Sequence, residues 1–350
     1  MTGKNSRDFA IVPWQLLTVG LVIAAALVAW RLQDLILLVF SSILVSIALT
    51  SMISFVERHA RLNRTASFII VTVALFVLFI VFFIVLGSQL QQQLVQLWNR
   101  LPELIRPVER WLGVSDTETW LAERAEAMMS QTFLLGRIAG LSSAAVGLLA
   151  NVVLVLVAAL YIAHRPELYR YGLVHLFPPR YRPHAEETFD AMDTGLRRWL
   201  MGQLLAMLLV GVLTYIGLRS LGVPSALALA VIAGVLEFIP FVGPILSAAP
   251  AIAIALAEGP RLALWVAALY LFIQQIEGNF LLPLIQEQAV MLPPAVTLFA
   301  LLAFGILFGP LGVVLATPLA VLLLIAVKQL WVRDSLHEKV ELPGEKVDDS

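Results

Sequence analysis

Long apolar runs constrain the fold of this chain more than any other feature of its sequence. Crossing the roughly 30 Å of hydrocarbon in a bilayer takes about 20 apolar residues in a helix. Runs of this kind occur at 11–30, 35–56, 68–87, 141–163, 199–217 and 261–282. Hydrophobic residues make up 60% of the chain and charged residues only 13%, whereas soluble domains carry about 25% charged residues. The sequence therefore predicts an all-α integral membrane protein and argues against a soluble enzyme.

The first run has a rival interpretation as a secretory signal peptide, because Lys4 and Arg7 precede it and small residues occupy 24–26. The apolar core of a signal peptide is about 7–15 residues long. This run is longer, and a second run follows it at once. We therefore expect a span that stays in the mature protein.

Two further apolar runs, 224–257 and 294–327, are too long for one simple span and contain helix breakers. Inside a helix, glycine costs about 1 kcal/mol and proline about 3 kcal/mol, and in lipid the freed backbone groups need other partners. We expect breaks near Pro240 in the first run and at 309–312 in the second. The expected fold thus has about eight transmembrane segments, two of them broken or re-entrant.

Lysine and arginine alternate between loops in a way that predicts the orientation. They gather in the N-terminal segment, after the second run, after the fourth run and in the C-terminal tail, while Arg31 and Arg219 stand alone in the other loops. Because cytoplasmic loops carry this excess, we expect both termini in the cytoplasm. Tryptophans near span ends, such as Trp199 and Trp331, are expected to anchor at the interface.

The segment 88–140 is amphipathic, with five Arg, five Glu and one Asp, so the charge rule allows it outside the cytoplasm. Apolar residues recur at alternating spacings of four and three from Leu90 to Trp111, which is a heptad-like stripe that Pro102 and Pro107 bend or interrupt. We expect an extracytoplasmic helical region. Its stripe packs on its own bundle, lies in the interface or contacts another subunit.

The chain accordingly divides into five parts. They are three N-terminal transmembrane helices (1–87), the amphipathic region (88–140), a fourth transmembrane helix with a basic cytoplasmic loop (141–198), a transport core with both broken segments (199–328) and a cytoplasmic tail (329–350).

The two broken runs resemble each other at an offset of 70 residues, which aligns Pro224 with Pro294, Phe238 with Phe308 and Pro240 with Pro310. Each run follows one plain span. If both are hairpins, they enter from opposite sides, as in inverted-repeat transporters whose substrate sites lie near the midplane at broken helices. We therefore expect a transport site where the two breaks meet.

Glu237 and Glu277 are the most informative ionisable residues of the C-terminal half. A charge at membrane depth costs about 2.5–3.5 kcal/mol on insertion scales, and such residues usually face a cavity or a proton path. A hairpin tip or a span end at the interface is the alternative for both. The predicted substrate or ion pathway comprises Gln203, Glu237, Phe238, Pro240, Gly243, Glu277, Asn279, Gly309, Gly312 and Thr317.

Several motifs in this half are similar to those of a known family. They are LEFIPFVGP at 236–244, Glu277 with Asn279, LPP at 292–294, GPLG at 309–312, ATP at 316–318, and the Gly202-Gln203 pair that begins the fifth span. Together they resemble the autoinducer-2 exporter family of permease-like bacterial membrane proteins. The resemblance covers nearly the whole chain and is most specific in the C-terminal half. It implies a transporter of the bacterial inner (plasma) membrane that self-associates, with a pentamer as the expected assembly.

The leading hypothesis is a secondary transporter or facilitator that exports a small polar solute, with autoinducer-2 as the candidate implied by the resemblance. A sodium/proton-type cation antiporter and a membrane scaffold that transports nothing are the alternatives. No catalytic, nucleotide-binding or metal-ligand motif occurs in a credible context, so we expect no enzyme activity, no cofactor and no metal. The net charge of −1 gives no general attraction to nucleic acid.

Overall fold

The computed structural model describes residues 17–81 except 19, 22, 23, 25, 26 and 29, and then 131–281 and 292–333. Within these ranges the chain is helical, with no strand. The helices are α2 (Gln33–Ala60), the helix Arg64–Val81, α5 (Gln131–His164), α6 (Pro166–His175), the short 3-10 turn η1 (Pro179–Tyr181), α7 (Arg182–Ser220), α8 (Ala226–Leu236), α9 (Val242–Glu258), α10 (Pro260–Ile276), the π-helical turn η2 (Glu277–Leu281), α12 (Pro294–Ala326) and the π-helical η3 (Val327–Arg333).

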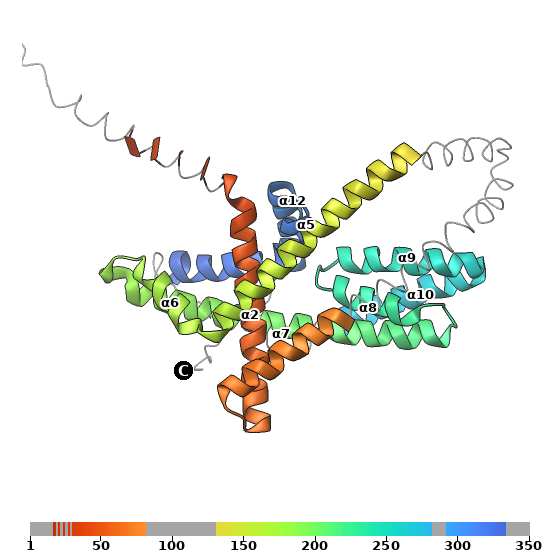
Figure 1. The fold of residues 1–350 in the computed structure, drawn as a ribbon, viewed down its shortest axis with the longest axis horizontal. Coiled ribbons are helices and arrows are strands. Elements are labelled where there is room, and N and C mark those ends of the chain that lie inside the picture. The colour runs from red at the N-terminus through yellow and green to blue at the C-terminus, as the bar shows by residue number, and fades with distance from the viewer. Residues whose placement is uncertain are drawn as a thin grey trace, which may run out of the picture.

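The N-terminal helices pack through small and branched apolar side chains. α2 ends at Arg61, whose φ of 52° is left-handed, and the Asn63 side chain then accepts a hydrogen bond from the Ala66 amide at 2.8 Å, which caps the next helix. α5 lies across α2 (Figure 1). Their shared core contains Leu49, Ile53, Val71, Ala159 and Ala163.

The 39-residue helix α7 is the central element of the fold. It packs against α2, α8, α10 and α12, and Figure 1 shows α8, α9 and α10 gathered along its second half with α6 at the opposite end. The fifth predicted span, 199–217, lies inside this helix, which begins 17 residues earlier at Arg182. The predicted basic loop is therefore mostly helical, and its first helix, α6, turns from α5 by 89° at Pro166.

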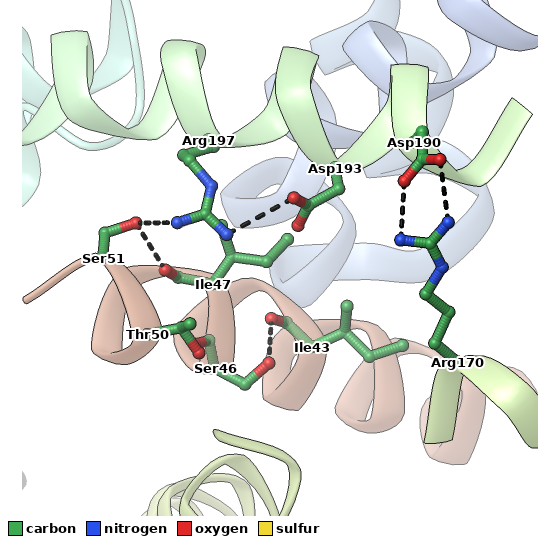
Figure 2. Close-up of polar contacts among 9 residues, drawn as sticks. All are labelled: Ile43, Ser46, Ile47, Thr50, Ser51, Arg170, Asp190, Asp193 and Arg197. Carbon is green, nitrogen blue, oxygen red and sulfur yellow. Dashed lines mark hydrogen bonds and ion pairs between the residues drawn. The ribbon is translucent and has the colours of Figure 1, made fainter. Parts of the chain in front are cut away.

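Charged side chains fasten the first half of α7 to its neighbours (Figure 2). Arg170 on α6 pairs with Asp190, with Nη1 2.6 Å from Oδ1, and this hydrogen bond raises the pKa of the Arg170 guanidinium above its ordinary value. Arg197 donates to the Ser51 hydroxyl on α2 at 2.9 Å and also contacts Asp193 at 3.3 Å. These contacts hold α2, α6 and α7 in one arrangement.

Both overlong runs are broken, as the sequence predicts. α8 ends at Leu236 and α9 begins at Val242, with Phe241 in between at a φ of 65°. α12 has a kink at Gly309, whose φ of 65° and ψ of −150° are not helical. A glycine follows each break against the backbone of the preceding helix: a Cβ on Gly243 would collide with the carbonyl of Leu236, and one on Gly312 with that of Phe304.

The expected eight transmembrane segments are confirmed only in part. Four described helices are long and apolar enough to cross a membrane, or five if the bent pair formed by the second part of α5 with α6 counts as one span. The predicted plain span 261–282 is helical as far as Leu281, as the 17 residues of α10 followed directly by η2, and its crossing of the membrane stays a prediction. The run 11–30 lies largely outside the described residues, as do the segment 88–140, apart from its last ten residues in α5, and most of the tail 329–350.

Candidate functional site

Glu237 occupies the break between α8 and α9 and is only 2% exposed. The last carbonyls of a helix lack intrahelical partners, and here the backbone carbonyl of Glu237 accepts a hydrogen bond from Gln203 Nε2 on α7 at 2.6 Å. Gln203 therefore meets the broken helix through the backbone, while the carboxyl group of Glu237 stays available for other contacts.

An aromatic pair supports the same break from one turn earlier on α7. The rings of Trp199 and Phe238 pack edge to face, with centroids 5.7 Å apart and an interplanar angle of 75°, an arrangement that aromatic quadrupoles favour. Trp199 is 7% exposed, so the expectation that it anchors at the interface is wrong. The spacing of four residues between Trp199 and Gln203, which puts both on one face of α7, is the sequence signal that could have revealed its role.

Glu277 comes to Glu237 from the end of α10. It begins the π-helical turn η2, its Oε2 accepts a hydrogen bond from Gln274 Nε2 at 3.0 Å, and its carboxyl group comes close enough to that of Glu237 to interact with it. Two carboxyl groups can hydrogen-bond to each other only when one of them carries a proton. The structure thus brings together the two acidic residues that the sequence singled out, 40 positions apart, as neighbouring carboxyl groups that can share a proton.

The surroundings of the carboxyl pair are amide and apolar groups. Within the part of the chain that the structure describes, neither Glu237 nor Glu277 has a lysine or arginine partner. The ion pairs that involve arginine lie instead on the first half of α7. Such a pair can exchange its proton or accept a cation, because no fixed positive charge already neutralises it.

The other predicted residues of the first break and of η2 have separate places. Pro240 and Gly243 shape the turn, in which the Val242 amide donates to the Pro240 carbonyl and the Gly243 amide to the Ile239 carbonyl, both at 2.8 Å. Asn279 is exposed and donates to Gln275 Oε1 at 3.2 Å. Asn279 is therefore not brought to the carboxyl pair by any described contact.

The second break meets the first through a shared apolar core. Phe238 and Phe308, the pair aligned by the 70-residue offset, both pack against this core, which α2, α7 and α12 build from residues that include Trp199 and Leu315. Thr317 is buried in α12 beyond the kink. No described hydrogen bond joins Glu237 to Gly309, Gly312 or Thr317, so the predicted meeting of the breaks is seen only as common packing.

Comparison with known proteins identifies the family of this chain. A model described as AI-2E family transporter matches residues 19–331. The chain belongs to the AI-2E transporter family. This is a family of membrane transporters and permeases, and the apolar helices of the chain agree with that assignment.

Relatives of the AI-2E family chain come from two well-known bacteria. “Putative transport protein YueF” of Bacillus subtilis (strain 168) is 30% identical over 252 residues, which cover 66% of this chain and 67% of that protein. YrrI of the same organism, described in the same words, is 30% identical over 268 residues, or 71% and 75% of the two chains. “AI-2 transport protein TqsA” of Escherichia coli (strain K12) is 26% identical over 228 residues, or 65% and 64%.

Proposed function

We propose that this AI-2E family protein is a secondary transporter or facilitator that exports a small polar solute. Autoinducer-2 is the first candidate, because the relative TqsA is named for its transport. The single observation that carries the proposal is the pair that buried Glu237 forms with half-buried Glu277 at a broken helix. Broken helices with ionisable groups at membrane depth are typical of transport sites.

The carboxyl pair supplies a means of coupling transport to protons. A pair that shares one proton carries a single negative charge, and losing that proton places two like charges side by side. The break at 237–241 has few helical hydrogen bonds to lose when this repulsion changes the local structure. The break then takes one arrangement when the proton is bound and another when it is released.

A monovalent-cation/proton antiporter is the second candidate, and the same pair favours it. Carboxylate and amide oxygens are ligands for hard cations, and Glu237, Glu277, Gln203 and Gln274 bring such oxygens to one place. A sodium ion entering between the carboxylates would displace the shared proton. A scaffold without transport has no need of this costly burial.

We further propose an inner-membrane orientation with both termini in the cytoplasm and a homo-oligomer, with five subunits as the number implied by the family resemblance. The alternation of arginine-rich and arginine-poor loops supports the orientation. Thiol labels that cannot cross the membrane, applied to a cysteine introduced near the C-terminus, test the orientation. Native mass measurement in detergent tests the subunit number.

The carboxyl pair is tested by transport in everted membrane vesicles and in proteoliposomes, with autoinducer-2 as one probe and sodium under a pH gradient as the other. Glu237→Gln keeps the size of the side chain but cannot titrate, so pH-dependent transport should be lost while assembly stays normal. Glu258→Gln changes an exposed glutamate at the turn from α9 to α10 and serves as the matched control.

Unchanged pH dependence in Glu237→Gln would contradict a coupling role for Glu237 and leave Glu277 as the next residue to change. Movement of sodium without movement of autoinducer-2 would select the antiporter. A protein that is folded and oriented in the vesicles but moves neither probe nor protons would favour the scaffold.

A further inference from the structure

The seam that α7, α8 and α10 form beyond the carboxyl pair contains two buried hydroxyl groups that the proposed site does not use. α7 and α10 run antiparallel: the Gln203 end of α7 meets the Glu277 end of α10, because both touch Glu237, and Gly217 lies against the Leu269 side chain. At this register, Thr214 on α7 and Tyr270 on α10 lie at the same level.

Both hydroxyls are buried without a partner. Thr214 is 0% exposed, and neither its Oγ1 nor the Tyr270 hydroxyl has a hydrogen-bond partner among the described residues. Buried polar groups are nearly always hydrogen-bonded, and exceptions call for a functional or solvent explanation. Two such groups on facing helices are a stronger signal than either one.

Helical spacing connects these hydroxyls to the carboxyl pair. Thr214 follows Gln203 by eleven residues, which is three turns, and Tyr270 precedes Glu277 by seven, which is two turns. Residues at these spacings share one face of a helix. Each helix thus presents a hydroxyl on the face that also carries its contact to the carboxyl pair.

The walls of the seam limit what can enter it. α7 and α8 approach closely where a Cβ on Gly234 would meet the Met207 carbonyl at 2.8 Å, and the apolar cluster against which Tyr270 packs includes Leu218 of α7, Leu229 and Val266. In such close packing we expect a route for molecules no larger than water. Water is small enough, and it needs a few polar groups to bind.

We propose that this seam is a hydration route that carries protons between the carboxyl pair and the end of the bundle where α7 ends and α10 begins. A carboxyl O–H of the pair gives its proton to a water molecule, and the proton passes along waters held by the Tyr270 and Thr214 hydroxyls, each of which can donate and accept. It leaves as hydronium, and the reverse sequence reloads the pair. The route rests on the proposed function of the pair, and by the predicted orientation it opens outside the cytoplasm.

Thiol labelling tests the hydration directly, without any knowledge of the transported solute. The sequence contains no cysteine, so Thr214→Cys, a change of nearly equal size, gives a single reactive site. We expect methanethiosulfonate ethylsulfonate to label it roughly tenfold faster than Leu218→Cys or more, because thiolate chemistry requires water at the sulfur. Leu218 is also fully buried on α7, one turn away. Equal labelling of the two variants would overturn the route.

Proton flux tests the function of the route. In proteoliposomes with an entrapped pH-sensitive dye and an imposed potassium diffusion potential, Tyr270→Phe and Thr214→Val should each slow proton flux by roughly tenfold or more, the scale of a lost proton-transfer group. Their melting temperatures should stay close to that of the wild type, because neither change leaves another described protein group without its hydrogen-bond partner. Tyr215→Phe, at an exposed tyrosine of α7, is the matched control.

The proton-flux results show whether the route or the proposed function of the carboxyl pair has failed. If Glu237→Gln abolishes proton flux while Tyr270→Phe and Thr214→Val leave it unchanged, the carboxyl pair stands and the route is refuted. If Glu237→Gln leaves proton flux intact, the proposed coupling function fails. The labelling contrast between Thr214→Cys and Leu218→Cys decides the hydration of the seam in either case.

Discussion

Replacing Gln203 with leucine tests how much of the stability of the first break depends on a single side chain. Leucine keeps a similar volume on α7 but removes the 2.6 Å hydrogen bond to the Glu237 carbonyl, which then stays buried and unsatisfied. In soluble proteins such a loss costs about 1–3 kcal/mol, while hydrogen bonds between membrane helices average about 0.6 and reach about 1.7 kcal/mol. Because this bond is short and its carbonyl ends a helix, we expect a loss of about 1–2 kcal/mol.

Thermal unfolding of the purified protein in detergent measures this loss. A loss of 1 kcal/mol shifts the melting temperature of a protein of this size class by about 2–4 °C, so Gln203→Leu should melt about 2–8 °C lower. Gln275→Leu is the control, since Gln275 is exposed and bonds only to exposed Asn279 among the described contacts. Equal melting temperatures for the two variants would refute the view that Gln203 caps α8.

Three further expectations concern the glycines and the charged half of α7. Alanine at Gly243 or Gly312 adds a Cβ against helix backbone. Size-exclusion profiles after detergent extraction should therefore show little folded protein for either variant. Gly147→Ala, which has open space around its Cβ, should give the wild-type profile. Arg197→Lys loses the forked guanidinium contact to Ser51 on α2 and Asp193 on α7. It should reduce the free energy of unfolding by under about 1 kcal/mol, an effect that shrinks in high salt. Asp190→Asn removes the ion pair to α6, and hydrogen exchange of α6 amides should become faster while that of α10 stays the same.

Local chemistry made much of the fold predictable. Pro240 and Gly309 favour a break in helical geometry, because one lacks an amide donor and the other readily takes a positive φ. The breaks in both overlong runs could therefore be read from the sequence. The all-helical character followed in the same way from the length of the apolar runs.

Features that depend on tertiary contacts were not predictable from local patterns. The extension of α7 back to Arg182 rests on its ion pairs with α6 and its contact with α2, which no window of sequence contains. The burial of Trp199 depends on Phe238, which lies 39 positions away. The end of α10 at Ile276 coincides with the π-helical turn that presents Glu277, and hydropathy alone extends the span past it.

The candidate site was partly predictable. Glu237 and Glu277 stood out because a carboxyl group in an apolar run is costly. Their pairing is a property of the folded chain, since it needs the turn at Gly259, with a φ of 150°, to bring α10 back along α9. Gln203 could be identified as polar in an apolar helix, but only the fold shows that it contacts backbone rather than the carboxyl group.

The continuity of α7 has a mechanical consequence. Arg197 and Gln203 are six residues apart on one uninterrupted helix, about 9 Å along its axis, and an α-helix turns and slides as a stiff rod. We therefore expect a rotation that releases Arg197 from Ser51 on α2 to move Gln203 relative to the Glu237 carbonyl as well. The stiffness of α7 would then couple the contact with α2 to the cap on the broken helix beside the carboxyl pair.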